Sequence, residues 1–129
     1  MTVTKSLYVL LILTGMFYSC SYKKEDIPNP VQSMSGCDTS NITYSKTIAP
    51  IIDQYCISCH GSNTYQAGGG GYNLDGYNNM KTYSEPGGIV IKSITSSSGV
   101  ISMPYGGPPL SSCDIAKIQS WINAGAPNN

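Results

Sequence analysis

Five consecutive residues, Cys56-Ile57-Ser58-Cys59-His60, constrain this chain more than any other stretch of its sequence. Two cysteines three positions apart lie on about one turn of chain, so both sulfur atoms can face one side of a planar group. The adjacent histidine can then offer a ring nitrogen to a metal. A Cys-x-x-Cys-His sequence is typical of covalent c-type haem attachment. The pattern therefore predicts haem thioethers at Cys56 and Cys59 and an axial iron ligand at His60.

The sequence allows two other interpretations of the cysteine pair. A thioredoxin-like redox pair follows a strand in a β-α-β unit, and no such pattern is present around Cys56. A structural zinc site needs four ligands, whereas the chain has one histidine and no second Cys-x-x-Cys pair. Haem uses all three residues of the motif, so one covalent haem c with its iron is the predicted cofactor.

The composition limits the size of the fold and the class of partner. The chain has 129 residues, which allows one domain with a modest core. Seven lysines balance seven acidic residues and arginine is absent. A basic face for nucleic acid is therefore not expected. Charged residues are scarce and glycines number 14, so loops should be long and the cofactor should supply part of the core.

The first twenty residues are typical of an export signal. Residues 7–17 form an apolar stretch that is too short for a membrane span of ~20 residues and suits a secretory signal. The stretch is followed by Ser19-Cys20, which resembles the lipobox of bacterial lipoproteins, where the cysteine is lipidated and becomes the mature N-terminus. We expect residues 1–19 to be a lipoprotein signal peptide and Cys20 to carry the lipid. An ordinary signal peptide cut nearby is the alternative.

The residues behind Cys20 are expected to form a tether. Residues 20–36 contain charges, prolines and serines, a composition that cannot bury a core. The predicted location is the cell envelope of a Gram-negative bacterium, lipid-anchored in the periplasm or at the outer-membrane surface. Export also permits disulfides. The folded domain is expected over residues 37–129.

Apolar residues at helical spacing predict a helix that leads into the haem motif. Its apolar stripe consists of Ile48, Ile51, Ile52 and Tyr55. Ser45 or Thr47 is placed to cap its N-terminus, and Pro50 is tolerated near its first turn. A helix that ends at Cys56 places the motif beside the core.

A second helix is expected near the C-terminal end. Ser111 and Asp114 form a Ser-x-x-Asp start that can satisfy free backbone donors, and Gly125 and Pro127 suit its end. Its apolar side consists of Ile115, Ile118, Trp121 and Ile122. We expect the indole to pack on the first helix and on the haem edge.

The iron of a haem has a second axial position, and methionine is the candidate ligand because the chain has no other histidine. Met1 and Met16 lie in the signal peptide and Met34 lies in the tether, which leaves Met80 and Met103. Met103 precedes a proline and a glycine- and proline-rich stretch, which suits a loop that presents a thioether to the iron. Met80 falls where a short helix is possible, and a core role is its simpler interpretation. We predict Met103 as the ligand, with Met80 or an open position as alternatives.

These features together resemble a small class I c-type cytochrome. The residues that carry the resemblance are, in order, the first helix, Cys56-x-x-Cys59-His60, the glycine run, Met103-Pro104 and the helix with Trp121. The stretches 48–52 and 121–127 are similar to cytochrome c-like domains of bacterial lipoproteins. The resemblance implies an all-α fold of three to four short helices around one haem, with His60 and Met103 as axial ligands. It also favours a helix over a strand for the β-branched residues 89–94.

The resemblance bears on the two remaining cysteines as well. Cys37 lies just before the first expected helix and Cys113 lies at the start of the last. In a cytochrome c fold these two helices pack together, so a disulfide between Cys37 and Cys113 is expected. Two free buried thiols are the alternative.

The expected function follows from the axial ligands. With His60 and Met103 both bound, the iron can change oxidation state and offers no open position to a substrate. We expect a monomeric electron carrier, not an enzyme, that serves redox protein partners. A haem enzyme or gas sensor with an open sixth position is the alternative, although no distal histidine or arginine is available to assist peroxide cleavage. A docking module of a surface complex is a third possibility.

Overall fold

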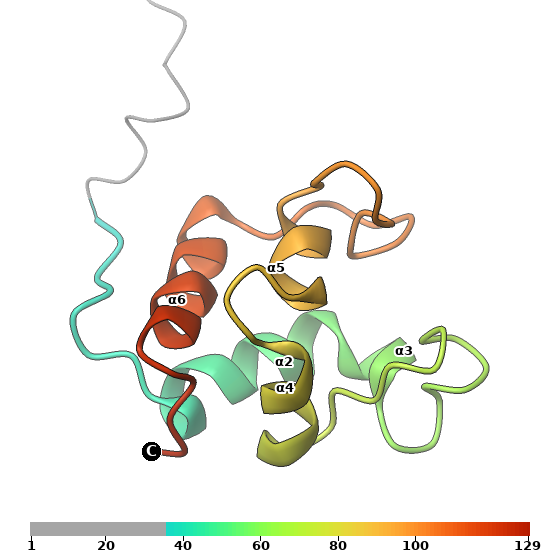
Figure 1. The fold of residues 1–129 in the computed structure, drawn as a ribbon, viewed down its shortest axis with the longest axis horizontal. Coiled ribbons are helices and arrows are strands. Elements are labelled where there is room, and N and C mark those ends of the chain that lie inside the picture. Colours follow the sequence, from blue (N-terminus) through green and yellow to red (C-terminus); the bar gives the residue numbers. More distant parts are fainter. Residues whose placement is uncertain (1–35) are drawn as a thin grey trace, which may run out of the picture. The chain divides into compact units, whose positions relative to one another are not determined.

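The computed structural model describes residues 36–129, and this part contains helices, turns and loops with no strand (Figure 1). The all-α expectation is therefore confirmed for it. The expected signal peptide (1–19), the lipid site Cys20 and the tether up to residue 35 lie outside the described residues. Among the described helices, none combines the length and the apolar character that crossing a bilayer requires.

Six helical elements follow one another in the described part. In chain order they are η3 (Tyr44–Ile48), α2 (Ala49–Tyr55), α3 (Ile57–His60), α4 (Tyr77–Tyr83), α5 (Ile89–Ile94) and α6 (Ser112–Asn123). The π-helical turn η3 runs directly into α2, and only Cys56 separates α2 from α3. These three elements form one nearly continuous stretch, so the described part has four helical stretches, within the expected three to four. The β-branched residues of α5 are helical, as the resemblance implied.

The first helical stretch begins earlier than its apolar stripe indicates. The expected cap at Ser45 or Thr47 is wrong, because both residues lie inside η3. Thr43 caps the stretch instead, and its Oγ1 accepts a hydrogen bond from the backbone N–H of Lys46 at 3.2 Å. The apolar spacing missed this turn because, of its residues, only Ile48 is buried.

The last helix has the predicted start and end. The hydroxyl oxygen of Ser111 accepts a hydrogen bond from the backbone N–H of Asp114 at 3.0 Å, and its O–H donates to the Asp114 carboxylate at 2.8 Å. After Asn123 the chain leaves the helix, and Gly125 has a φ of 87°, a conformation that favours glycine. The capping residues read from the sequence are confirmed.

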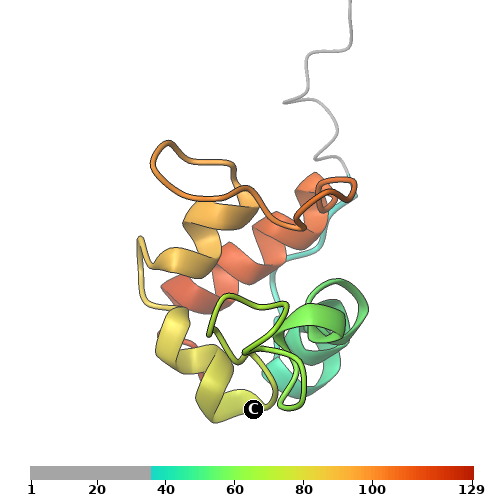
Figure 2. The ribbon, with the colours of Figure 1, turned by 90° about the vertical axis from the view of Figure 1, so that its right-hand side faces the viewer.

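One apolar core joins these helices. Its buried members are Ile48, Ile51, Ile52, Leu74, Met80, Val90, Ile91, Ile94, Leu110, Ile118, Trp121, Ile122 and Ala126. α6 packs against both η3 and α5 (Figures 1 and 2). Trp121 is 1% exposed, and its ring centroid lies 5.7 Å from that of Tyr44. The expected contact between the last helix and the start of the first is confirmed.

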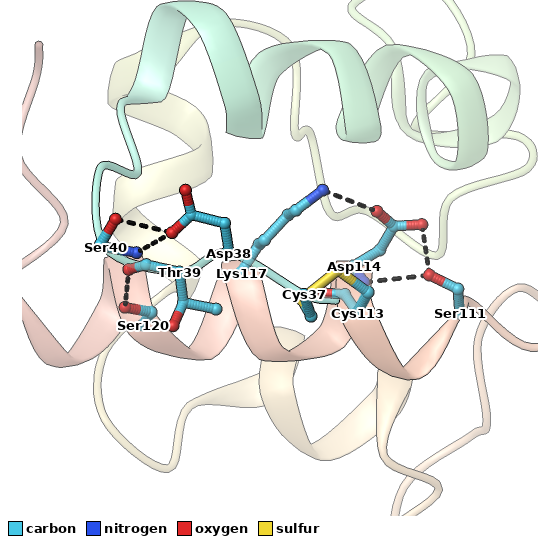
Figure 3. Close-up of a disulfide and its surroundings, with 9 residues drawn as sticks. All are labelled: Cys37, Asp38, Thr39, Ser40, Ser111, Cys113, Asp114, Lys117 and Ser120. Atoms are coloured by element: carbon cyan, nitrogen blue, oxygen red, sulfur yellow. Dashed lines mark hydrogen bonds and ion pairs between the residues drawn. A yellow bond between two sulfur atoms is a disulfide. The ribbon is translucent and has the colours of Figure 1, made fainter. Parts of the chain in front are cut away.

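A disulfide fixes the segment before η3 to the first turn of α6. Cys37 and Cys113 are bonded, with their Cα atoms 5.4 Å apart (Figure 3). Two turns further along α6, the Ser120 hydroxyl donates to the Thr39 carbonyl at 3.5 Å. The bond spans 76 positions, and a loop of that length restricts the unfolded chain by about 4 kcal/mol. The predicted pairing is present, and the alternative of two free thiols is not.

Candidate functional site: a helical turn with two free cysteines and a fixed histidine

The Cys-x-x-Cys-His motif forms one helical turn at the end of the first helical stretch. The backbone N–H groups of Cys59 and His60 both donate to the Cys56 carbonyl, at 3.1 and 2.8 Å. Gly61 follows in an extended conformation and ends α3. The two cysteines and the histidine therefore lie on a single turn, as the spacing predicts.

The two cysteines of the motif are free, because the disulfide uses Cys37 and Cys113. Cys59 is exposed, whereas Cys56 is half-buried and packs against the core. Burial raises the pKa of the Cys56 thiol to about 11. A reactive dithiol pair depends on a cysteine of lowered pKa, so this environment disfavours the thioredoxin-like alternative. Two free sulfur atoms on one turn suit thioether attachment.

The His60 ring is held by one hydrogen bond. Its Nδ1 lies 2.8 Å from the backbone carbonyl oxygen of Tyr72. A carbonyl can only accept, so Nδ1 carries a proton, and in the neutral imidazole Nε2 then keeps a free lone pair. Histidines that bind metals almost always donate their other ring N–H to such an acceptor. His60 therefore has the tautomer that an axial ligand needs.

The glycine-rich loop after the motif folds back onto it. Gly69 is buried, and a Cβ at this position would lie 2.8 Å from the Cys59 carbonyl oxygen and 2.9 Å from His60 Nδ1. Only glycine allows this approach. Further along, the Leu74 backbone N–H donates to the His60 carbonyl at 2.8 Å. The loop thus contacts both the ring and the backbone of the histidine.

Met103 lies outside any helix, between α5 and α6, as predicted. Its side chain is half-buried and packs against the core, and its backbone N–H donates to the Ser93 carbonyl at 3.0 Å. In Figure 1 the loop between α5 and α6 lies at the top with its tip toward the right, and α3 lies below it at the right. Met80 is fully buried in the core, which agrees with a packing role. Of the two candidate methionines, only Met103 is partly accessible.

Sequence reasoning missed the residues that surround His60. Tyr72, Gly69 and Leu74 were not expected to contact the histidine, because their roles depend on how the loop folds back. The only signal was the position of the glycine run, a few residues after the motif.

Two further observations concern the rest of the described part. No group of three or more His, Cys, Asp or Glu side chains gathers in residues 36–129 as metal ligands would.

A cavity of about 430 Å³ lies between α4, the turn after it and the end of α6, and none of the four predicted haem-contacting residues lines it. Ser84 lines this cavity, and its hydroxyl is buried without a hydrogen-bond partner among the described residues.

Comparisons with known proteins give no relative. No protein-family model matches the chain, and no similar protein is found among curated proteins or solved structures. Its function is therefore inferred from the geometry around Cys56, Cys59, His60 and Met103.

Proposed function

We propose that this chain is a mono-haem c-type cytochrome that carries single electrons between redox protein partners outside the cytoplasm. The observation that carries the proposal is the hydrogen bond from His60 Nδ1 to the Tyr72 carbonyl. It leaves Nε2 available on the same turn that offers two free cysteines. The motif, the free thiols and the histidine tautomer are separate requirements of a covalent haem site, and they coincide within five residues.

Each residue of the site has a distinct role in this proposal. If a haem is bound, Cys56 and Cys59 would hold it through thioethers, and His60 Nε2 and the Met103 sulfur would be the iron ligands. When bound, the haem supplies a one-electron iron couple, and a methionine ligand raises its reduction potential. With His60 and Met103 both serving as iron ligands, the site would offer no open position to a substrate and would suit electron transfer.

A cytochrome c-like fold is part of the proposal. The packing of η3 against α6 supports it, together with the order of the motif, the Met103 segment and the last helix. We further propose that the chain is a monomer in the cell envelope of a Gram-negative bacterium, anchored by a lipid on Cys20. A Cys20→Ser variant should then leave the membrane fraction for the soluble fraction. Retention of this variant in the membrane would contradict the lipid anchor.

Covalent attachment can be tested with two matched cysteine pairs. The protein is produced in a host with c-type maturation and analysed by haem staining and mass spectrometry under denaturing conditions. We expect wild type to retain haem and a Cys56→Ala/Cys59→Ala variant to lose it. A Cys37→Ala/Cys113→Ala variant loses the same number of sulfur atoms and should keep the haem. Wild-type protein without covalent haem would refute the proposal.

The sixth ligand can be tested with two matched methionines. Replacement of methionine by leucine keeps apolar volume and costs little in a core. Met103→Leu should abolish the long-wavelength charge-transfer band of ferric His/Met haem, whereas Met80→Leu should leave it unchanged. An unchanged band in Met103→Leu would exclude Met103 as the ligand and favour an open or differently filled position.

A further inference from the structure

We infer that Tyr83 is a positioning residue for His60: its ring braces residues 72–74, which hold the histidine, and thereby adjusts the reduction potential of the haem. Tyr83 lies at the C-terminal end of α4, more than twenty positions from His60. The inference rests on the proposed function, because it concerns the potential of the bound haem.

One short segment, residues 72–74, holds His60 at two points. The Tyr72 carbonyl accepts from His60 Nδ1 at 2.8 Å, and the Leu74 backbone N–H donates to the His60 carbonyl at 2.8 Å. A displacement of residues 72–74 therefore changes the ring contact and the backbone contact together.

The two ends of residues 72–74 are held in place by different contacts. Leu74 is 7% exposed and belongs to the core, so it anchors one end. Tyr72 is 42% exposed, and the core does not enclose it. Its ring instead packs edge-to-face on the Tyr83 ring, with the centroids 5.3 Å apart and the planes at 75°. Aromatic pairs of this geometry are stabilising beyond the area they bury.

Tyr83 is placed to act as a fixed support for the Tyr72 ring. It is half-buried and packs against the core from α4. Neither the Tyr83 hydroxyl nor the Tyr72 hydroxyl makes a hydrogen bond to another described residue. The contact between the two tyrosines is made by their rings. Phenylalanine at position 83 should therefore preserve the brace, whereas alanine should remove it.

The expected effect on the haem has a defined sign. A strong hydrogen bond from Nδ1 makes the imidazole more basic, and a more basic ligand stabilises the ferric state. Loss of the brace loosens this hydrogen bond, so the ferric state loses stability and the reduction potential rises. Direct outer-shell partners change affinity or activity by about 10–100-fold when mutated, and an indirect brace should have a smaller effect.

The test compares two tyrosines of the same helix. Tyr77 also belongs to α4 and makes an edge-to-face pair, with Tyr44 at 5.1 Å, and its hydroxyl donates to the Ala126 carbonyl at 2.9 Å. Tyr83→Ala should increase the equilibrium constant for haem reduction by about threefold to tenfold, where tenfold corresponds to 59 mV for one electron. Tyr77→Ala should lower the melting temperature without this change, and Tyr83→Phe should restore the wild-type potential.

A second measurement reports on the hydrogen bond itself. Solvent exchange of the His60 Nδ1 proton, followed by NMR, should accelerate in Tyr83→Ala and not in Tyr77→Ala. If Tyr83→Ala does not mature with haem, Tyr83→Leu keeps apolar volume at the same position and should show the same rise in potential. A reduction potential that shifts no more in Tyr83→Ala and Tyr83→Leu than in Tyr77→Ala would contradict the positioning role of Tyr83.

The same experiment separates this inference from the proposed function. If the wild-type protein carries haem with a reversible potential and Tyr83→Ala leaves that potential unshifted, the positioning role of Tyr83 is wrong. The proposed function is not contradicted by that result. Wild-type protein that carries no haem overturns both.

Discussion

Two regions of the described part are held together by different interactions. The scaffold, defined as residues 37–48 and α6, is fixed by apolar burial around Trp121 and by the disulfide. In the site loops, defined as residues 56–76 and 101–109, hydrogen bonds to backbone groups hold the turn that carries His60. α3 contributes no buried side chain, and the exposed large apolar residues Tyr72, Ile101 and Tyr105 all lie in the site loops.

The difference indicates that the two regions determine different properties of the protein. Stability should depend on the scaffold, where apolar side chains and a covalent bond join residues far apart in sequence. The properties of the proposed haem should depend on the site loops, where small displacements change the contacts of His60. Substitutions in the two regions should therefore affect different observables.

The largest effect on stability is expected at Trp121, the largest side chain of the core. Its ring is almost fully buried and its indole N–H donates to the Pro127 carbonyl at 2.9 Å. Replacement of a buried Trp by Ala costs about 3–5 kcal/mol, so Trp121→Ala should unfold at much lower urea concentration. A loss below ~1 kcal/mol, well under that range, would show that the scaffold does not depend on this contact.

The disulfide should give a comparable but separable effect. Cys37→Ala/Cys113→Ala removes a restraint of about 4 kcal/mol on the unfolded chain, so the urea midpoint should fall. The spectrum of the folded protein should stay the same, because neither residue contacts the motif. A changed haem spectrum under folding conditions would break the division between scaffold and site loops.

Gly69→Ala should have a smaller effect on stability and a direct effect on the site. The added Cβ would lie within 3 Å of both the Cys59 carbonyl and His60 Nδ1, and forced overpacking costs about 1–3 kcal/mol. The reduction potential of the proposed haem should shift as well, because the glycine-rich loop would move away from the His60 ring. Gly68→Ala is the matched control, since its Cβ would meet its neighbours at 3.6 Å or more. Equal reduction potentials in Gly69→Ala and Gly68→Ala would contradict the close approach of Gly69 to His60.

The smallest effect is expected at Ser84, outside both regions. Its hydroxyl is buried and has no partner among the described residues, and a buried unsatisfied polar group costs about 1–3 kcal/mol. Ser84→Ala should therefore raise the free energy of unfolding by about 1 kcal/mol and leave the potential unchanged. A loss of stability would indicate that the hydroxyl has a bound partner, such as an ordered water.

The scaffold and the site loops also differ in how far the sequence predicts them. Ile118, Trp121 and the Ser111 cap are visible in the sequence because helical spacing and capping chemistry are local signals. The cysteine spacing likewise predicts the turn that carries His60. The Tyr72 carbonyl is a backbone group, however, and any residue at that position would supply it.

The roles of Gly69 and Tyr83 could not be predicted for a related reason. Each depends on a contact made after the chain from Gly61 to Gly76 has folded back onto α3, and that stretch has no periodic apolar pattern. Loop contacts of this kind become visible only in three dimensions.

The absorption spectrum of the purified chain tests the central claim most directly. The full chain is produced in a host with c-type maturation, and its spectrum is recorded oxidised and then reduced. We predict the sharp bands of a reduced c-type haem, reversible on reoxidation, with the charge-transfer band of methionine ligation in the ferric form. A colourless protein with intact Cys56 and Cys59 thiols would contradict the claim.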